Sequence, residues 1–241
     1  YPLVGTPASE EKSPGPISYW SFNEGYGTIA YDATSNNNDG TITGATWQTE
    51  DMCISGKCLY FDGNSVVNLD FNKISNLIDN ELTMMVWVSP IEAENSSWQA
   101  PFGGNANPQN KGWYDIGLFI YQNDFQYEIT DNNGDCHADY ADYDDIQNNE
   151  WYLLTMTYGN GQLCGYVNGG NQNCISKSVN LANFSDFYIG GGYATNFKGF
   201  IDEVKIYDYA RTDAQIKADF LAGKAHGGAT FRGTAVSMGG L

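Results

Sequence analysis

The sequence predicts an all-β fold in which two antiparallel sheets pack as a sandwich, with one short helix close to the C-terminus. Short apolar segments recur along the chain and are separated by turn-forming residues. Aromatic residues make up 15% of the 241 residues and there are 28 glycines, a composition that suits short strands and tight turns. One late stretch, residues 212–223, has helical spacing with marked ends. A chain of this length fits a single domain.

Alternation of apolar and polar residues places the strands. The clearest case is residues 82–89, whose four even-numbered apolar residues share one face. Residues 90–111 are polar and rich in Gly and Asn, so we expect a long loop there, of the kind that often carries binding residues. The strands expected in chain order are residues 16–22, 41–47, 59–61, 66–69, 82–89, 113–121, 125–130, 151–158, 162–167, 187–190 and 200–207.

The last expected strand carries an irregularity. Ile201 and Val204 are three residues apart, whereas Val204 and Ile206 are two apart, so the alternation slips at Asp202-Glu203. A β-bulge at this point would restore the register. A carboxylate buried there needs a partner, because an unpaired buried charge is very costly. A cation is the simplest partner.

The expected helix follows directly. Thr212 and Gln215 have the spacing of a capping box, and Ile216 and Phe220 lie one turn apart. Gly223 is a natural residue to end the helix. The sequence therefore predicts a helix over residues 212–223.

This strand and helix carry a resemblance to a known family. Residues 199–216 (Gly-Phe-Ile-Asp-Glu-Val-Lys-Ile-Tyr-Asp-Tyr-Ala-Arg-Thr-Asp-Ala-Gln-Ile) resemble the end of laminin-G-like and pentraxin-like jelly rolls of the concanavalin A type. The resemblance covers residues 16–222 and implies a two-sheet antiparallel jelly-roll sandwich. The other matching blocks, in the family's order, are Tyr-Trp-Ser-Phe-Asn-Glu-Gly at 19–25, residues 32–40, Gly-Lys-Cys-Leu-Tyr-Phe-Asp-Gly at 56–63, Trp-Tyr-Leu-Leu-Thr-Met-Thr-Tyr at 151–158 and Gly-Tyr-Val-Asn-Gly at 165–169.

The resemblance also implies a structural Ca²⁺ ion between the first-strand turn and an acidic residue of the last strand. Calcium takes six to eight oxygen ligands, from carboxylates and from backbone and Asn carbonyls. The alternative is that the Asp and Asn residues of the 32–39 turn only form local Asx turns. The candidate ligands are Asp202, Asn23, Asp32, Asn36 and Asn38.

A second candidate calcium site is the acidic stretch at residues 131–145, which holds six aspartates. Five oxygen-bearing residues fall at positions 1, 3, 5, 9 and 12 of a calcium-loop pattern, but Cys136 replaces the expected Gly and the last position is Asp. The alternative is a solvated acidic loop. Residues 190–196 contain no acid, which argues against the ligand mode of pentraxin-like relatives. The candidate ligands are Asp131, Asn133, Asp135, Asp139 and Asp142.

Charge and cysteine content indicate the setting. The net charge of −18 disfavours nucleic acid and anionic membranes as partners and favours divalent cations, and no apolar run approaches a membrane span. The sequence starts at Tyr1 rather than Met, from which we expect a removed leader and an extracellular or cell-surface location.

Five cysteines in an acidic chain fit an oxidising compartment. Cys53 and Cys58 flank a four-residue turn and are expected to form one disulfide. If residues 168–170 form a three-residue hairpin loop, Cys164 stands opposite Cys174, close enough for a second disulfide. Cys136 is then left over, either buried or paired between chains. The alternative is that all five are buried thiols.

Catalysis is not expected. Glycan hydrolases need two carboxylates flanking a cleft, and the nearest approach, Glu128 and Asp131, lies three apart at a strand end and so on opposite faces. Binding of sugar is a better match, because aromatic rings stack on sugars while Asn and Asp bond hydroxyls. For each single aromatic the alternative is a core position. The candidate ligand-binding residues are Trp98, Trp113, Tyr140 and Tyr143.

We therefore expect a secreted, non-catalytic, calcium-stabilised module that binds glycan or extracellular matrix, formed by residues 16–223. Asn95 and Asn183 begin glycosylation sequons. Residues 1–15 are expected to be an extended arm and residues 224–241 a Gly-rich tail. The alternative function is a structural subunit of an extracellular filament or surface assembly, in which these tails dock on identical subunits.

Overall fold

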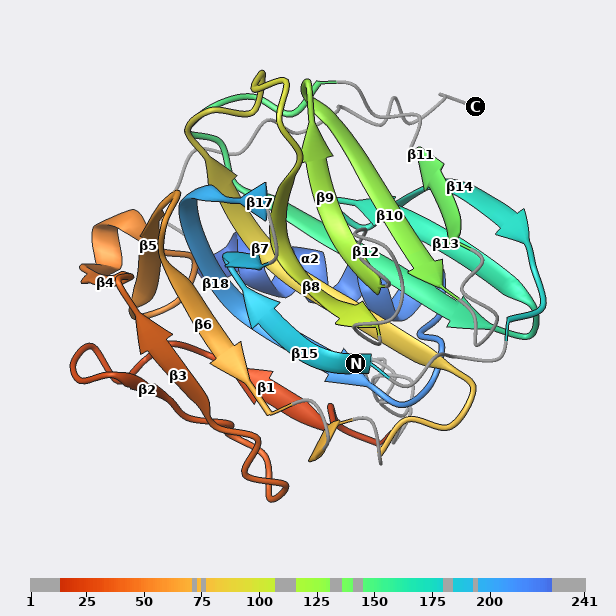
Figure 1. Cartoon of the computed structure of the whole chain (residues 1–241), viewed down its shortest axis with the longest axis horizontal. Coiled ribbons are helices and arrows are strands. Elements are labelled where there is room, and N and C mark those ends of the chain that lie inside the picture. The colour runs from red at the N-terminus through yellow and green to blue at the C-terminus, as the bar shows by residue number, and fades with distance from the viewer. Residues whose placement is uncertain are drawn as a thin grey trace, which may run out of the picture.

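The computed structural model describes residues 14–70, 73–74, 77–106, 116–130, 136–140, 145–179, 184–192 and 195–226. Two eight-stranded antiparallel sheets face one another across a shared core, and one helix lies on the outside of the first sheet (Figure 1). The predicted all-β jelly-roll sandwich is confirmed. No helix in the described part of the chain has both the length and the apolar character needed to cross a membrane.

The first sheet, sheet A, has eight strands. Its spatial order is β14 (Gly170–Ser176), β13 (Gln162–Val167), β12 (Tyr152–Gly159), β7 (Leu82–Pro90), β18 (Lys198–Tyr207), β5 (Cys58–Asp62) and β4 (Thr46–Gln48). β1 (Ser18–Trp20) also pairs with β18. On one edge of β18, residues 198–201 pair with β5 and residues 204–206 pair with β1. That edge therefore changes partner at Asp202-Glu203.

The second sheet, sheet B, has the order β11 (Cys136–Tyr140), β10 (Asp124–Thr130), β9 (Ile116–Tyr121), β8 (Gln99–Ala106), β15 (Phe184–Ile189), β6 (Val66–Leu69), β3 (Gly40–Thr43) and β2 (Ile29–Ala30). The described residues also include a two-stranded ribbon of β16 (Gly191–Gly192) and β17 (Thr195–Asn196) and the 3₁₀ helix η1 (Glu50–Met52). The core between the sheets contains the fully buried rings of Trp20, Phe22, Phe61 and Phe102.

β7 is buried on both faces. Its even-numbered residues Leu82, Met84, Val86 and Val88 face the core between the sheets, as the alternation predicted. Its remaining residues include Met85 and Trp87, which lie in a second apolar cluster on the outer face of sheet A. That cluster is closed by the helix α2 (Asp213–His226), whose Phe220 ring stacks on the Trp87 ring with centroids 5.7 Å apart.

The end of α2 differs from the prediction. Thr212 and Gln215 do form the predicted capping box, in which the backbone N–H of each donates to the side-chain oxygen of the other. The helix does not end at Gly223, however, but continues to His226. A Cβ on Gly223 would lie 2.4 Å from the Trp87 ring, so this glycine serves close packing of the helix on sheet A rather than helix termination.

The prediction of a long loop over residues 90–111 was wrong, because β8 lies within it and forms a central strand of sheet B. The Gly and Asn content of this stretch predicted a loop. In the sheet, Gly103 pairs with Gly117 of β9, and the ring of Phe119 lies where a Cβ of Gly117 would be, 2.5 Å from that position. These glycines therefore make room within a strand.

The hairpin between β13 and β14 reaches the predicted cysteine pairing by another route. Its loop is a two-residue turn of Asn168 and Gly169, since Val167 pairs with Gly170. The expected three-residue loop was wrong. A β-bulge after Gly165 supplies the missing residue and brings Cys164 opposite Cys174.

Candidate functional site

The bulge predicted at Asp202-Glu203 is confirmed. The register with β7 shifts between Asp202 and Lys205, and Glu203 has a φ of 51°, a left-handed conformation that is unusual for a residue with a side chain. Such strained residues persist only where their surroundings hold them. Here the surroundings are the chain segments that meet where β18 changes its partner from β5 to β1.

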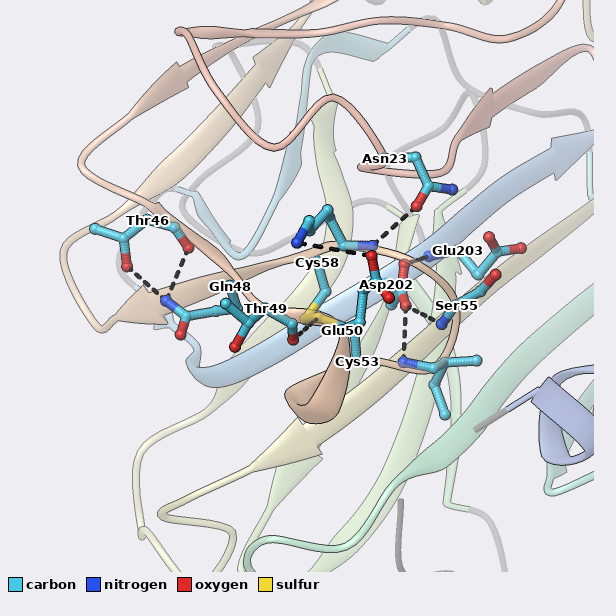
Figure 2. The surroundings of a disulfide bond; sticks show 12 residues. Asn23, Thr46, Gln48, Thr49, Glu50, Cys53, Ser55, Cys58, Asp202 and Glu203 are labelled. Atoms are coloured by element: carbon cyan, nitrogen blue, oxygen red, sulfur yellow. Dashed lines mark hydrogen bonds and ion pairs between the residues drawn. A yellow bond between two sulfur atoms is a disulfide. The ribbon is translucent and has the colours of Figure 1, made fainter. Parts of the chain in front are cut away.

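Asp202 is completely buried and is held by backbone amides (Figure 2). Its Oδ2 accepts the N–H groups of Ile54 and Ser55 at 2.9 and 3.0 Å, and its Oδ1 accepts the N–H of Glu203 at 2.8 Å. Burial raises the pKa of Asp202 well above its usual range, and the amide donors act in the opposite direction. The partners of the buried Asp202 carboxylate are therefore backbone N–H groups, two of them from the loop at residues 53–58.

That loop is closed by the predicted Cys53–Cys58 disulfide, with the Cα atoms 5.5 Å apart. Asn23 holds its other side, since Asn23 Oδ1 accepts the N–H of Lys57 at 2.9 Å. Figure 2 shows Asn23 and Asp202 on either side of the same short loop. The loop thus links the segment after β1 to the bulge of β18. The predicted Cys164–Cys174 disulfide is also present.

Glu203 points to β1. Tyr19 donates its hydroxyl to both carboxylate oxygens of Glu203 at 2.7 Å, and the ammonium of Lys205 lies 3.2 Å from one of them and 4.7 Å from the centre of the Tyr19 ring. Burial, followed by the nearby Glu203 carboxylate, raises the pKa of Tyr19. The two carboxylates of the bulge therefore hold different segments.

The turn at residues 32–39 covers the free edge of β1. Asp32 Oδ1 accepts the N–H of Tyr19 at 2.9 Å, and the carbonyl of Tyr19 accepts the N–H of Ala33 at 2.8 Å. The side chains of Thr34, Asn36 and Asn38 each donate to the carbonyl of Ile17. The turn thereby satisfies strand groups that would otherwise be open for pairing with another chain.

The predicted calcium ligands fall into these two structural roles. Asn23 and Asp202 bind the loop at residues 53–58, whereas Asp32, Asn36 and Asn38 organise the turn beside β1. Within the described ranges, no three His, Cys, Asp or Glu side chains gather as a group that would hold a metal ion. The known hydrogen bonds of Asp32 and Asp202 are thus those of structural carboxylates, and calcium at Asp202 stays a prediction.

The second candidate calcium site lies mostly outside the described residues. This applies to Asp131, Asn133, Asp135 and Asp142. Asp139 lies in β11 opposite Tyr127, but its side chain is outside the description. Calcium binding by residues 131–145 therefore stays a prediction, with a solvated acidic loop as the alternative.

Trp98 forms part of an aromatic group that we call the shelf, made of Trp98, Tyr121 and Phe119. The rings of Trp98 and Tyr121 are stacked, with centroids 5.1 Å apart and 25° between their planes. Phe119 is buried and meets Trp98 edge-on at 5.9 Å, so it supports the ring from the sheet. Trp98 and Tyr121 each keep part of their surface exposed.

Polar groups hold the loop that carries Trp98. The turn of Gln122 and Asn123 joins β9 to β10, and its N–H groups donate to the carbonyls of Asn95 and Ala93. The Oδ1 atom of Asn123 is buried and has no hydrogen-bond partner within the described part of the protein. The side-chain amide of Asn148 donates to the carboxylate of Glu94 at 2.7 Å. The loop that carries Trp98 is therefore fixed by backbone and side-chain hydrogen bonds at residues 93–95.

The sequence analysis named Trp98 as a candidate ligand residue but did not name Tyr121 or Asn123. Their association depends on β8 and β9 being neighbours, and β8 was read as a loop. The signal that existed was the Gln-Asn pair between two predicted strands, which is typical of a tight turn. The other predicted ligand residues, Trp113 and Tyr143, and the sequon residue Asn183 lie outside the described residues, as does the side chain of Tyr140. Asn95 lies in the loop beside Trp98.

A family model described as the concanavalin A-like lectin/glucanases superfamily matches residues 61–217. The chain belongs to this superfamily. No curated protein matches it in sequence. Among solved structures, it is similar to domain 4 of AbnA, a GH43 extracellular arabinanase from Geobacillus stearothermophilus, in complex with arabinotriose, at 22% identity and a TM-score of 0.66, covering 86% of this chain and 98% of that one.

It is also similar to the receptor-binding domain of botulinum neurotoxin C/D mosaic serotype, at 15% identity, a TM-score of 0.65 and coverage of 86% of this chain. The binding domain of Paraclostridial mosquitocidal protein 1 gives 16% identity, a TM-score of 0.63 and the same coverage. The chain spans about half the length of these toxin domains, 51% and 52%. At such identities the similarity shows the fold alone.

Proposed function

We propose that this domain is a non-catalytic module that binds carbohydrate at the shelf formed by Trp98, Tyr121 and Phe119. The observation that carries the proposal is the stacked, partly exposed pair of Trp98 and Tyr121, which is fixed from below by a buried ring. A rigid aromatic surface binds the apolar face of a sugar at low entropic cost, because few side-chain rotations are lost.

The polar side chains around the loop that carries Trp98 support the same function. Sugar hydroxyls require hydrogen-bond partners, and the amides and carboxylates of Asn123, Asn148 and Glu94 lie around the loop that carries Trp98. The buried Oδ1 of Asn123 has no hydrogen-bond donor within the described residues, so this turn keeps an unused acceptor. The similar arabinanase domain was solved with arabinotriose, which makes this trisaccharide a suitable first probe.

The setting that we propose is extracellular, and it rests on the two disulfides together with the superfamily. Calcium remains a proposed stabiliser at Asp202. The alternative of a filament subunit depends on residues 1–15 and 224–241, almost all of which lie outside the described residues. No observation on the described part of the chain favours it over carbohydrate binding.

A glycan array that includes arabinotriose tests the proposal, with Trp98→Ala and Trp98→Phe beside the unaltered protein. We expect Trp98→Ala to lose at least tenfold in affinity and Trp98→Phe to lose less, because a smaller ring still stacks. An array on which the unaltered protein binds nothing, or on which Trp98→Ala binds equally well, would overturn the proposal.

A further inference from the structure

The loop between β1 and β2 presents a second aromatic side chain to solvent. Tyr26 is 80% exposed, the largest value among the described large hydrophobic residues. A ring held this far into water contributes almost nothing to the folded core. Tyrosine is enriched at contacts with ligands and partners, because one ring offers both apolar area and a polar hydroxyl.

The backbone around Tyr26 is held in place on both sides. Gly25 and Gly27 have φ values of +71° and +82°, which glycine adopts without strain, and they turn the chain sharply around the tyrosine. The carbonyl of Gly27 accepts the indole N–H of Trp47 at 3.0 Å. A Cβ on Gly25 would lie 3.4 Å from the side chain of Lys57, so that part of the loop rests on Lys57.

The base of this loop is closed as well. Glu24 Oε1 accepts the N–H of Tyr31 at 2.7 Å, while Glu24 Oε2 is buried and has no hydrogen-bond partner within the described residues. Phe22 is fully buried and meets the ring of Trp47 edge-on at 6.4 Å. An exposed ring on an anchored loop resembles the shelf in its physical design, since little conformational entropy is lost when a ligand binds.

Lys57 adds a hydrogen-bond donor beside the loop, next to Gly25. Its side chain is partly exposed, and the distance of 3.9 Å from its ammonium to the Glu50 carboxylate is at the limit of an ion pair. An ammonium has three donors and a flexible stem, which suits the oxygens of a sugar. We call Tyr26, the two glycines beside it and Lys57 the Tyr26 tip.

The two aromatic sites lie far apart on the molecule. β9, which ends at Tyr121, and β2, which follows the Tyr26 tip, are separated in sheet B by β8, β15, β6 and β3. Five strand spacings of about 4.8 Å place the two strands on the order of 24 Å apart. Figure 1 accordingly shows β2 at the left and β9 in the right half of the sandwich.

We propose that the Tyr26 tip is a second carbohydrate-contacting site, in which the Tyr26 ring stacks on a sugar and Lys57 donates to its oxygens. The proposal rests on the carbohydrate function proposed for the shelf and extends it, because two sites on one rigid sandwich bind a long polysaccharide more tightly than either site alone. The ligand class is therefore a polymeric glycan rather than a free short sugar.

The test is a nuclear magnetic resonance titration with arabinotriose and with the oligosaccharide that binds best on the array. In Trp98→Ala protein, in which the shelf is disabled, the backbone amides of Gly25, Gly27 and Lys57 are expected to shift on sugar addition. Tyr26→Ala should abolish these shifts, and Tyr26→Phe should retain them. The matched control is Tyr31→Ala, which removes another exposed tyrosine ring and should leave the shifts intact.

On the matching immobilised polysaccharide, Tyr26→Ala in the otherwise unaltered protein should weaken binding at least tenfold. If sugar shifts amides at the shelf but not at the Tyr26 tip, the second site is wrong while the proposed function stands. If neither site responds, both fail. Shifts at the tip that follow protein concentration instead of sugar would also overturn the proposal, since they would assign Tyr26 to contact between two copies.

Discussion

Two loops of this protein, residues 53–58 and residues 91–98, are fixed by different parts of the sandwich. They differ in what they expose to solvent. The first directs its amides inward to the buried Asp202 and is closed by a disulfide. The second is tied to the turn after β9 by backbone bonds and leaves Trp98 partly exposed on Tyr121. Both are ordered by hydrogen bonds, but only the second leaves apolar surface for a ligand.

The described acidic residues that the sequence predicted as ligands therefore lie apart from the carbohydrate site proposed at the shelf. Asp202 and Asp32 are the described acids with the greatest burial among the predicted ligands, and both use their oxygens to bind backbone N–H groups. Carboxylates of this kind stabilise the fold. The rings of Trp98 and Tyr121 are less conspicuous in the sequence, but part of their apolar surface is exposed to solvent.

The largest expected loss of stability follows Asp202→Ala. Three backbone donors lose their acceptor in a buried site, and each unsatisfied group costs about 1–3 kcal/mol, part of which is recovered by water and by removal of the buried charge. We expect a loss of about 3 kcal/mol in the free energy of unfolding, measured by chemical denaturation. Asp208→Ala is the matched control, because Asp208 is exposed at the end of the same strand segment.

The same measurement with and without EDTA separates the amide role of Asp202 from calcium binding. If amides alone account for it, the difference between the unaltered protein and Asp202→Ala is the same in both conditions. If the calcium proposal is right, EDTA destabilises the unaltered protein and leaves Asp202→Ala unchanged.

Loss of the Cys53–Cys58 disulfide ranks second. Closing a loop of this size stabilises by about 2 kcal/mol through the entropy of the unfolded chain. The double variant Cys53→Ser with Cys58→Ser should lose about this amount. Its loss should overlap with that of Asp202→Ala when both are combined, because both act on the same loop. Strict additivity of the two losses would contradict the linkage between the disulfide loop and the bulge.

Trp98→Ala is expected to cost only about 1 kcal/mol of stability, since a partly exposed ring and two ring contacts are removed. Its effect on sugar binding should be far larger. Chemical denaturation and array binding of the same preparation measure the loss of stability and the loss of sugar affinity. A large loss of affinity beside a small loss of stability indicates a surface role in binding. A stability loss comparable with that of Asp202→Ala would place Trp98 in the core of the fold instead.

Tyr26→Ala should have the smallest effect on stability, less than about 0.5 kcal/mol, because the ring is almost wholly in water. Thermal unfolding against the unaltered protein measures it. A clear loss of stability would mean that Tyr26 is held by contacts within the folded protein, and it would remove the reason for treating the residue as a surface contact.

The sequence predicted the sandwich, the bulge and both disulfides because these depend on local patterns. Alternation in β7 and its slip at Asp202 are readable over a few residues, and so is the capping box at Thr212. The partner of Asp202 was not readable, since Ile54 and Ser55 are about 150 positions away and contribute only backbone. β8 was missed because its Gly103 makes room for the backbone of the neighbouring strand β9, a contact that appears only once the sheet is formed.

The position of β18 has a consequence for how the chain acquires its structure during synthesis. This strand is the last of sheet A in the sequence, yet it pairs with β1, β5 and β7, which are made much earlier. Contacts of such long sequence separation form slowly, because the intervening chain must first be closed into a loop. Until residues 198–207 leave the ribosome, the earlier strands have an unpaired gap at the centre of the sheet. A chain that stops before Lys198 is therefore expected to remain unfolded and to need protection from aggregation.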